Sequence, residues 1–339
     1  MDSVTHIAIG ICAGELIAGK KLGKTAMLWG AIANSFPDVD VISSLWMSTA
    51  DSLLAHRGFT HSILFQLLLI PLAAFFLKRL YSKKEFSFNG WMLLIGSNLF
   101  LHIFLDALTA YGTGWFEPFS HYRVSFNTLF ILDPFFSIGF VVGAIILLIL
   151  KAKSSSRQKV ARICVIISGA YLLFTLVNKV SVNELIEKSL TRGKISNENY
   201  FSTPTPLNNF LWYIVAHDSN GVHIGYYSIF DSTDNIQYTT IIQNPHLADS
   251  LKGNEDIEKL VRFSQGYYML EKSNDVVVFS DLRMGQLGGW ADPEAPFVFR
   301  YFLKERPNNS LMIQQGRMKA MQDGAFESLW NRIKGERSF

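Results

Sequence analysis

The sequence predicts a multi-pass α-helical membrane domain over residues 1–178, followed by a soluble α+β domain over residues 179–339. First, 49% of the 339 residues are hydrophobic and only 17% are charged, which is unusual for a soluble protein. Second, the long apolar runs stop near residue 178, and clusters of Asn, Asp, Gly and Pro follow. Third, the net charge is only +3, and the cations stand in short groups between apolar runs. This distribution is typical of membrane topology, so no nucleic-acid partner is expected.

Six apolar segments make up the predicted membrane domain. A membrane-spanning helix needs about 20 mostly apolar residues. Four segments reach or approach that length, at residues 62–80, 91–110, 129–150 and 160–178. Residues 4–19 and 25–36 are shorter and rich in Gly and Ala, which favours close helix packing. The sequence leaves open whether these first two segments cross the whole bilayer.

The cations predict the orientation of these segments. Lys and Arg cluster in the connections between the first and second, the third and fourth, and the fifth and sixth segments. The two intervening connections carry only Arg57 and Arg123. Because basic connections stay in the cytoplasm, we expect the N-terminus, the Arg57 and Arg123 connections and the C-terminal domain on the extracytoplasmic side.

Seven potential metal ligands fall on the predicted outer side. The positions of Lys and Arg alone predict that side, so the ligands are an independent observation. They are His6, Asp38, Asp40, His56, His61, His102 and Asp106. His102 and Asp106 are four residues apart, so on a helix they share one face. An ionised Asp at bilayer depth costs about 2.5–3.5 kcal/mol on insertion scales, and a bound cation would offset that cost. The alternative is a hydrogen-bonded pair that ties helices together.

Asp38 and Asp40 follow Pro37, which predicts an extended or turning backbone there. The two carboxylates would bridge two ions, or else form a solvated acidic turn at a helix end.

His56 and His61 lie in the stretch His56-Arg57-Gly58-Phe59-Thr60-His61-Ser62. They are five residues apart, so only a turn would bring them together. Gly58 supplies the backbone freedom for that turn, and Thr60 is the expected N-cap of the next helix. The alternative is a helix cap with incidental histidines.

Seven ligands are more than a single catalytic zinc takes. We therefore expect two or three divalent ions, zinc or else manganese, which lower the pKa of a bridging water and clamp a phosphoryl group. Arg57 and Arg123 are predicted to hold phosphate oxygens, or else to pair with lipid headgroups or carboxylates. Tyr111 would donate a hydrogen bond or sit in the interfacial aromatic belt.

Other polar residues give weaker signals. His121, Asp133 and Glu15 are not assigned as ligands, although Glu15 could support a ligand from behind. Three further histidines lack metal-like spacing and are interpreted as structural: His217, His223 and His246.

The predicted soluble domain begins with a hairpin. Residues 211–216 and 222–230 alternate and are rich in aromatic side chains, and they flank the turn Asp218-Ser219-Asn220-Gly221. Further strands are expected at residues 238–242, 266–271, 276–280 and 297–303, helices at 256–263 and 318–333, and a loop at 285–289.

The motifs of the first half resemble the bacterial membrane-bound metal-dependent hydrolase family, one branch of which is described as LexA-binding, inner-membrane-associated hydrolases. The resemblance covers residues 1–180. It rests on Met1-Asp2-Ser3 with Thr5-His6, Pro37-Asp38-Val39-Asp40, the stretch 56–62, and His102 with Asp106, Thr109, Tyr111, Gly112 and Thr113. It implies a hydrolase in the bacterial inner membrane.

A more distant similarity is to the zinc phospholipase C and single-strand nuclease group, whose helical enzymes hold three zinc ions. That similarity implies ligand roles for His6, Asp38 or Asp40, His56 or His61, and His102 with Asp106. The sequence departs from the group in one respect, because no His-x-x-x-Glu pair follows Asp106.

Together these observations predict a membrane-embedded, metal-dependent phosphoesterase that acts on a lipid or lipid-linked headgroup at the outer membrane face. The alternative is a non-enzymatic membrane protein with a structural metal site and an outer domain that binds an unidentified protein partner. An ion transporter is less favoured, because the ligands gather at one end of the segments instead of lining a path across the membrane.

Overall fold

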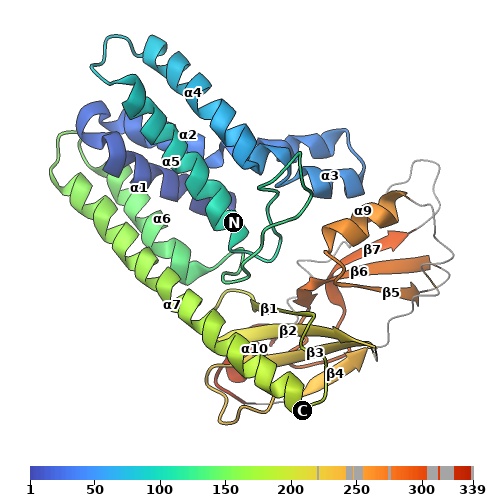
Figure 1. Cartoon of the computed structure of the whole chain (residues 1–339). Helices are drawn as coiled ribbons and strands as arrows, with labels where there is room; N and C mark the ends of the chain where they lie inside the picture. Colours follow the sequence, from blue (N-terminus) through green and yellow to red (C-terminus); the bar gives the residue numbers. More distant parts are fainter. Residues whose placement is uncertain are drawn as a thin grey trace. The chain divides into compact units, whose positions relative to one another are not determined.

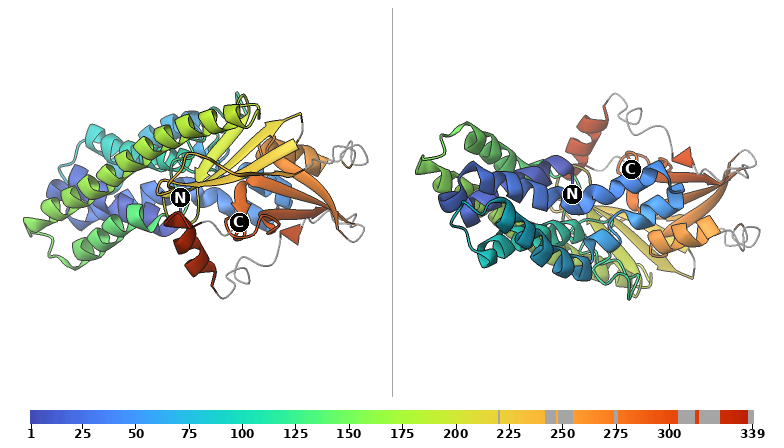
Figure 2. Two further views of the ribbon diagram at one scale, coloured as in Figure 1. Left: turned by 90° about the horizontal axis from the view of Figure 1, so that it is seen from below. Right: turned by 90° about the horizontal axis from the view of Figure 1, so that it is seen from above.

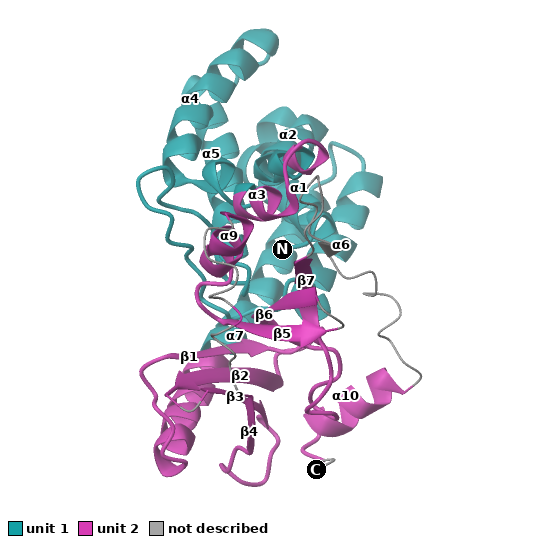
Figure 3. Cartoon of the chain, turned by 90° about the vertical axis from the view of Figure 1, so that its right-hand side faces the viewer, with its two compact units in different colours: residues 1–42, 55–176 teal, residues 43–54, 177–339 magenta. Residues whose placement is uncertain are grey.

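The computed structural model describes residues 1–219, 221–241, 247, 255–273, 276–303, 312–313 and 324–336. The chain forms two compact units, one of residues 1–42 with 55–176 and one of residues 43–54 with 177–339 (Figure 3). Two helices matter for this division. Helix α7 (Ser156–Arg192) contributes to both units, and the short α3 (Thr49–Ala55) lies almost wholly in the second.

The first unit is a bundle of helices that run side by side (Figures 1 and 2). Its elements are α1 (Ser3–Leu22), α2 (Lys24–Ser35), the 3-10 helix η2 (Phe59–His61), α4 (Ile63–Leu80), α5 (Phe88–Ala107), α6 (Pro134–Ile149), the first part of α7, and the 3-10 helix η1 (Phe36–Leu45) up to residue 42. Serine and aspartate side chains cap several of these helices, as helix N-termini require. Ser62 begins α4, Ser87 begins α5 and Asp133 begins α6.

Three described helices are long and apolar enough to cross a membrane: α4, α5 and α7. The segment predicted at 129–150 is shorter in the structure than expected. It forms a helix only from Pro134 and has 16 residues, because Asp133 caps its start by accepting from the backbone N–H groups of Phe135 and Phe136. Pro37 also differs from expectation, since the chain continues after it as the 3-10 helix η1.

Helices α1 and α2 pack through glycines. A Cβ atom on Gly10 or Gly14 would overlap the backbone of α2, and one on Gly30 would overlap the backbone of α1. This close packing is what the Gly and Ala content of the two segments predicted. It places His6 of α1 beside Asn34 of α2, where their side chains bond.

The second unit contains two antiparallel four-stranded sheets. The first has the order β1 (Tyr200–Pro204), β2 (Leu211–Asp218), β3 (Gly221–Ser228) and β4 (Tyr238–Ile241). The second has the order β5 (Tyr268–Ser273), β6 (Val276–Gln286), β7 (Phe297–Leu303) and β8 (Met312–Ile313). Two helices complete the unit, α9 (Glu255–Phe263) and α10 (Ala325–Ile333).

The hairpin of β2 and β3 is confirmed, with Leu211 opposite Ser228 and Asp218 opposite Gly221. Strand β6 runs on to Gln286, so the first two residues of the loop predicted at 285–289 belong to the strand. Strand β1 was not predicted. His246 and residues 318–323 of the expected last helix lie outside the described residues.

Candidate metal centre

Four predicted ligands come together in the first unit. Their ligand atoms all lie within 4.8 Å of one another, and they belong to Asp38 of η1, His61 of η2, and His102 and Asp106 of α5. The side chains of His61, His102 and Asp106 are fully buried, whereas that of Asp38 is 17% exposed. The cluster is therefore closed on the α5 side and open at Asp38.

The hydrogen bonds of His102 fix which ring nitrogen carries its proton. Nδ1 lies 2.6 Å from the backbone oxygen of Asn34, which can only accept, so Nδ1 is the N–H. In the neutral ring, Nε2 then presents a lone pair. It lies 3.0 Å from His61 Nε2, 3.3 Å from Asp106 Oδ2 and 3.5 Å from Asp38 Oδ1.

Asp106 Oδ2 is buried and makes no hydrogen bond within the described part of the chain, although Arg57 Nε lies 3.2 Å and His61 Nε2 3.3 Å from it. Buried polar atoms without a hydrogen bond are rare and call for an explanation. A cation held between Asp106 Oδ2, Asp38 Oδ1 and the ring nitrogens of His61 and His102 would supply one, since these atoms lie together. These residues fit a divalent metal ion. The hydrogen bond from His102 Nδ1–H to a backbone carbonyl is also the arrangement that usually orients a metal-binding histidine.

His6 stands behind Asp106 and outside the cluster of four. Its Nε2 lies 3.1 Å from Asp106 Oδ1, and its Nδ1 lies 3.0 Å from Asn34 Oδ1. The amino group of Met1 also contacts Asp106 Oδ1. The Oδ1 atom of Asp106 is thus held by Met1 and by His6 of α1, whereas Oδ2 faces the cluster.

A second group shares Asp38 and contains Asp40 and His56. Asp40 Oδ1 lies 2.8 Å from His56 Nδ1, and Asp40 Oδ2 accepts from the backbone N–H of Arg57 at 3.0 Å and from Thr60 Oγ1 at 2.6 Å. The His56 side chain is 24% exposed. Burial would raise the pKa of Asp40, but hydrogen bonds from His56 and His61 hold it well below its usual range.

His61 shows how strongly the centre attracts positive charge. Burial lowers the pKa of its imidazole, but the carboxylates of Asp106, Asp38 and Asp40 outweigh burial and raise this pKa to about 10. Without a metal ion, the three carboxylates therefore keep a proton on His61. A divalent ion would take the place of that proton.

The turn that joins His56 to His61 agrees with prediction in one respect and differs in another. Gly58 has φ of −89° and ψ of −122°, outside the regions that L side chains favour, and the residue before it, Arg57, is left-handed with φ of +59°. Thr60 donates to Asp40 and does not cap a helix; Ser62 caps α4 instead, by accepting from the backbone N–H of Phe65. The turn is shaped by its bonds to Asp40.

Both predicted phosphate-binding arginines are engaged within the protein. Arg57 is 1% exposed, donates to Thr109 Oγ1 at 2.8 Å, and has its Nε 3.2 Å from Asp106 Oδ2. Arg123 donates to the backbone oxygen of His56 at 3.0 Å. Both guanidinium groups lie over the ring of Tyr111, with Cζ 4.9 Å and 5.7 Å from its centroid. Tyr111 also meets the edge of His56.

The unassigned polar residues have structural partners. His121 pairs with Glu117 at the surface, Asp133 accepts from Tyr171 as well as capping α6, and Glu15 pairs with Arg157. Sequence reasoning missed Asn34, which supports His6 and His102 at once. An amide inside an apolar segment was the signal that could have revealed it.

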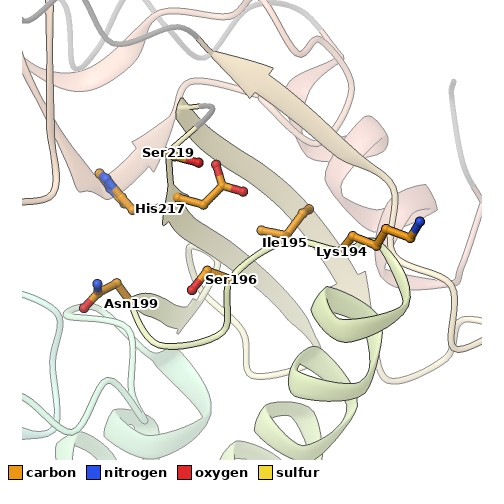
Figure 4. A pocket seen from close by; sticks show the side chains of 7 residues that line it. Lys194, Ile195, Ser196, Asn199, His217 and Ser219 are labelled. Atoms are coloured by element: carbon orange, nitrogen blue, oxygen red, sulfur yellow. The ribbon is translucent and has the colours of Figure 1, made fainter.

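The second unit has a pocket of its own, with a volume of about 630 Å³ (Figure 4). It lies between the end of the β2 strand and the chain that follows α7, and its lining is mostly polar: Lys194, Ile195, Ser196, Asn199, His217, Asp218 and Ser219. His223 pairs with Asp218 at 2.9 Å. Neither His217 nor His223 belongs to a metal-like group within the described ranges.

The fold and this cluster define an integral membrane protein: a helical unit with three candidate membrane spans and a His/Asp cluster able to hold a metal ion, followed by a unit of antiparallel sheets. The chain belongs to the YdjM inner membrane protein family, whose model matches residues 1–182. An inner-membrane location follows from this membership. The side of the membrane and the membership of a metal-dependent hydrolase family stay predictions.

Two curated relatives extend the comparison. The chain is 32% identical over 122 residues to inner membrane protein YbcI of Escherichia coli K12, which covers 35% of this chain and 69% of YbcI. It is 25% identical over 320 residues to the uncharacterized protein YfhP of Bacillus subtilis 168, which covers 88% of this chain and 90% of YfhP. No solved structure matches the chain significantly.

Proposed function

We propose that this protein is a membrane-embedded, metal-dependent hydrolase of phosphoesters. The observation that carries the proposal is the shape of the centre. Three buried ligands close it on one side, and Asp38 and His56 are partly exposed on the other. A purely structural cluster needs no such opening, whereas a catalytic one does.

Two ion positions sharing Asp38 are the arrangement that the residues support. Asp38, His61, His102 and Asp106 would hold one ion, and Asp38, Asp40 and His56 a second. Zinc suits this set of imidazoles and carboxylates, and manganese is the alternative. Such ions supply an activated water at neutral pH and stabilise charge on a phosphoryl group.

The chain's own residues would orient the substrate and move protons. Asp40 accepts from His56 Nδ1–H, so the other ring nitrogen of His56 is left with a lone pair at the open side. Arg57 acts as a positioning residue through its contact with Asp106, because its guanidinium is buried. Arg123 is buried as well and acts as a positioning residue through its bond to the His56 backbone oxygen. Tyr111 meets the edge of the His56 ring and is the group proposed to orient the phosphoester.

The experiment begins with metal analysis of detergent-purified protein. We expect two equivalents of zinc or manganese in the wild type, and a large loss in the double variant His102→Ala, Asp106→Ala that retains its helical circular dichroism. No metal in protein purified with supplemented metal would refute the proposal.

Turnover separates an enzyme from a structural site. His56→Gln should keep the ion held by the buried ligands and lose at least tenfold in hydrolysis of phosphodiester or phosphomonoester lipids in vesicles. His121→Gln is the matched control, because His121 pairs only with Glu117 among the contacts described for it. If no phosphoester is turned over although metal is bound, the centre is structural.

That structural alternative has its own supporting observation. Three ligands of the first group are fully buried, as in closed structural sites, and the second unit offers a polar pocket for a ligand or partner. In that case the metal would staple the helices, and the second unit would do the binding.

A further inference from the structure

The loops around the metal centre expose apolar side chains. Val41 and Ile42 are exposed at the end of the acidic segment, and Phe59 is exposed in the turn that carries His61. Phe119 is 83% exposed and Tyr122 is 63% exposed in the connection after α5, where Phe116 is exposed as well. We call these six side chains the apolar rim.

Backbone bonds join the loops that carry the apolar rim. Gly114 N–H donates to Arg57 O at 2.8 Å, and Ile63 N–H donates to Trp115 O at 2.9 Å. Arg57 N–H donates to Asp40 Oδ2 at 3.0 Å. The three loops are therefore fixed to one another, and two of them carry ligands of the centre.

The longest of these loops presents little free charge. Of its ionisable side chains, Glu117 pairs with His121, Arg123 is buried against His56, and Asp133 caps α6. Exposed apolar side chains that gather on connected loops whose charges are paired mark an interaction site in a protein. The helices next to these loops indicate what kind of partner the site binds.

The loops continue directly from candidate membrane spans. Helix α4 begins at Ile63, two residues after His61, and α5 ends at Ala107, one residue after Asp106. If these candidate helices cross the membrane, the loops at their ends lie at the boundary between hydrocarbon and water. Phe, Tyr and aliphatic side chains at that boundary bury their apolar parts in lipid.

We propose that the apolar rim inserts into the bilayer interface, so that the metal centre receives its phosphoester from a membrane lipid and not from a water-soluble ester. The choice of substrate rests on the proposed function. The insertion itself does not, because it follows from the exposed side chains and their place at the ends of the spans.

Insertion is tested by spin labels in vesicles of phosphatidylethanolamine and phosphatidylglycerol. One label is attached at Phe119→Cys and a control label at Phe326→Cys, since Phe326 is also exposed but belongs to α10. Cys12 and Cys164 are buried, so unmutated protein gives the blank. We expect the label at 119 to be relaxed more by oxygen than by a water-soluble nickel complex, and the control label to show the reverse. Equal behaviour of the two labels would overturn insertion.

Substrate choice is tested with Phe116→Ser, Phe119→Ser, whose exposed positions leave the core intact. Hydrolysis of a long-chain phosphodiester lipid in vesicles should fall at least tenfold, while hydrolysis of a water-soluble short-chain phosphodiester stays within twofold. Equal loss on both substrates would overturn lipid delivery by the rim. Absence of hydrolysis on both, already in the wild type, would refute the proposed function, and the spin labels would still decide insertion.

Discussion

Replacing Asn34 with alanine tests whether the centre holds a metal and how it is supported. The Asn34 side chain bonds His6 Nδ1 at 3.0 Å and donates to the Asn98 backbone oxygen at 3.1 Å, whereas its own backbone oxygen holds His102. Asn34→Ala therefore keeps the support of His102 and removes that of His6. Because His6 contacts Asp106, a ligand in the proposed site, the change lies two hydrogen bonds from the proposed metal position.

The size of the effect follows from this distance. Loss of a group that supports a ligand typically costs about 10–100-fold in metal affinity. We expect the lower end, about tenfold or ~1.4 kcal/mol, since Asp106 itself is retained. The measurement is a zinc titration of metal-free protein in competition with a chelating dye.

Asn178→Ala is the matched control. Asn178 is also a buried asparagine that donates to a backbone oxygen, that of Asn209, but it belongs to the second unit. Its zinc affinity should equal that of the wild type. An Asn34→Ala affinity within twofold of the wild type, or an equal loss in both variants, would show that the His6 to Asp106 contact does not support a metal.

Three further predictions concern single positions. Arg57→Gly should be more stable than Arg57→Ala by about 1 kcal/mol in the free energy of unfolding, because φ is +59° at this residue, and it should therefore melt at a higher temperature. Equal melting temperatures of the two variants would contradict the geometry of the turn. Asp133→Ala should lower the unfolding free energy by about 0.5–2 kcal/mol through loss of the α6 cap, with unchanged metal content; lost metal would make Asp133 a ligand. Burial, helped by the nearby His223, lowers the pKa of His217, so the unfolded chain takes up that proton first. Stability of the second unit, followed by denaturant titration of the full chain, should therefore decline as pH drops below about 6.5, and His217→Gln should decline less; parallel pH profiles would exclude His217.

Much of the first unit could be predicted because bilayer depth restricts the residue types. Apolar runs indicated the helices, and His or Asp residues that were costly at such positions indicated the cluster of Asp38, His61, His102 and Asp106, which the structure brings together. Whether these residues bind metal stays a prediction. The turn at Arg57 was harder, because its backbone angles are set by bonds to Asp40 that connect residues far apart in sequence.

Long-range contacts also limited prediction of the second unit. Residues 43–54 belong to that unit, and Asp51 pairs with Lys259 at 2.8 Å, which no local pattern indicates. Strand β1 was missed because its Ser, Thr and Pro are typical of loops; it forms through pairing with β2, where Thr203 lies opposite Tyr213.

The scattered origin of the ligands has a consequence for biogenesis. During synthesis the growing chain offers only one local pair, His102 with Asp106, and that pair becomes useful after α5 has been made and has met η1 and η2. In the proposed metal site, an ion would therefore be held only once these separate segments have come together.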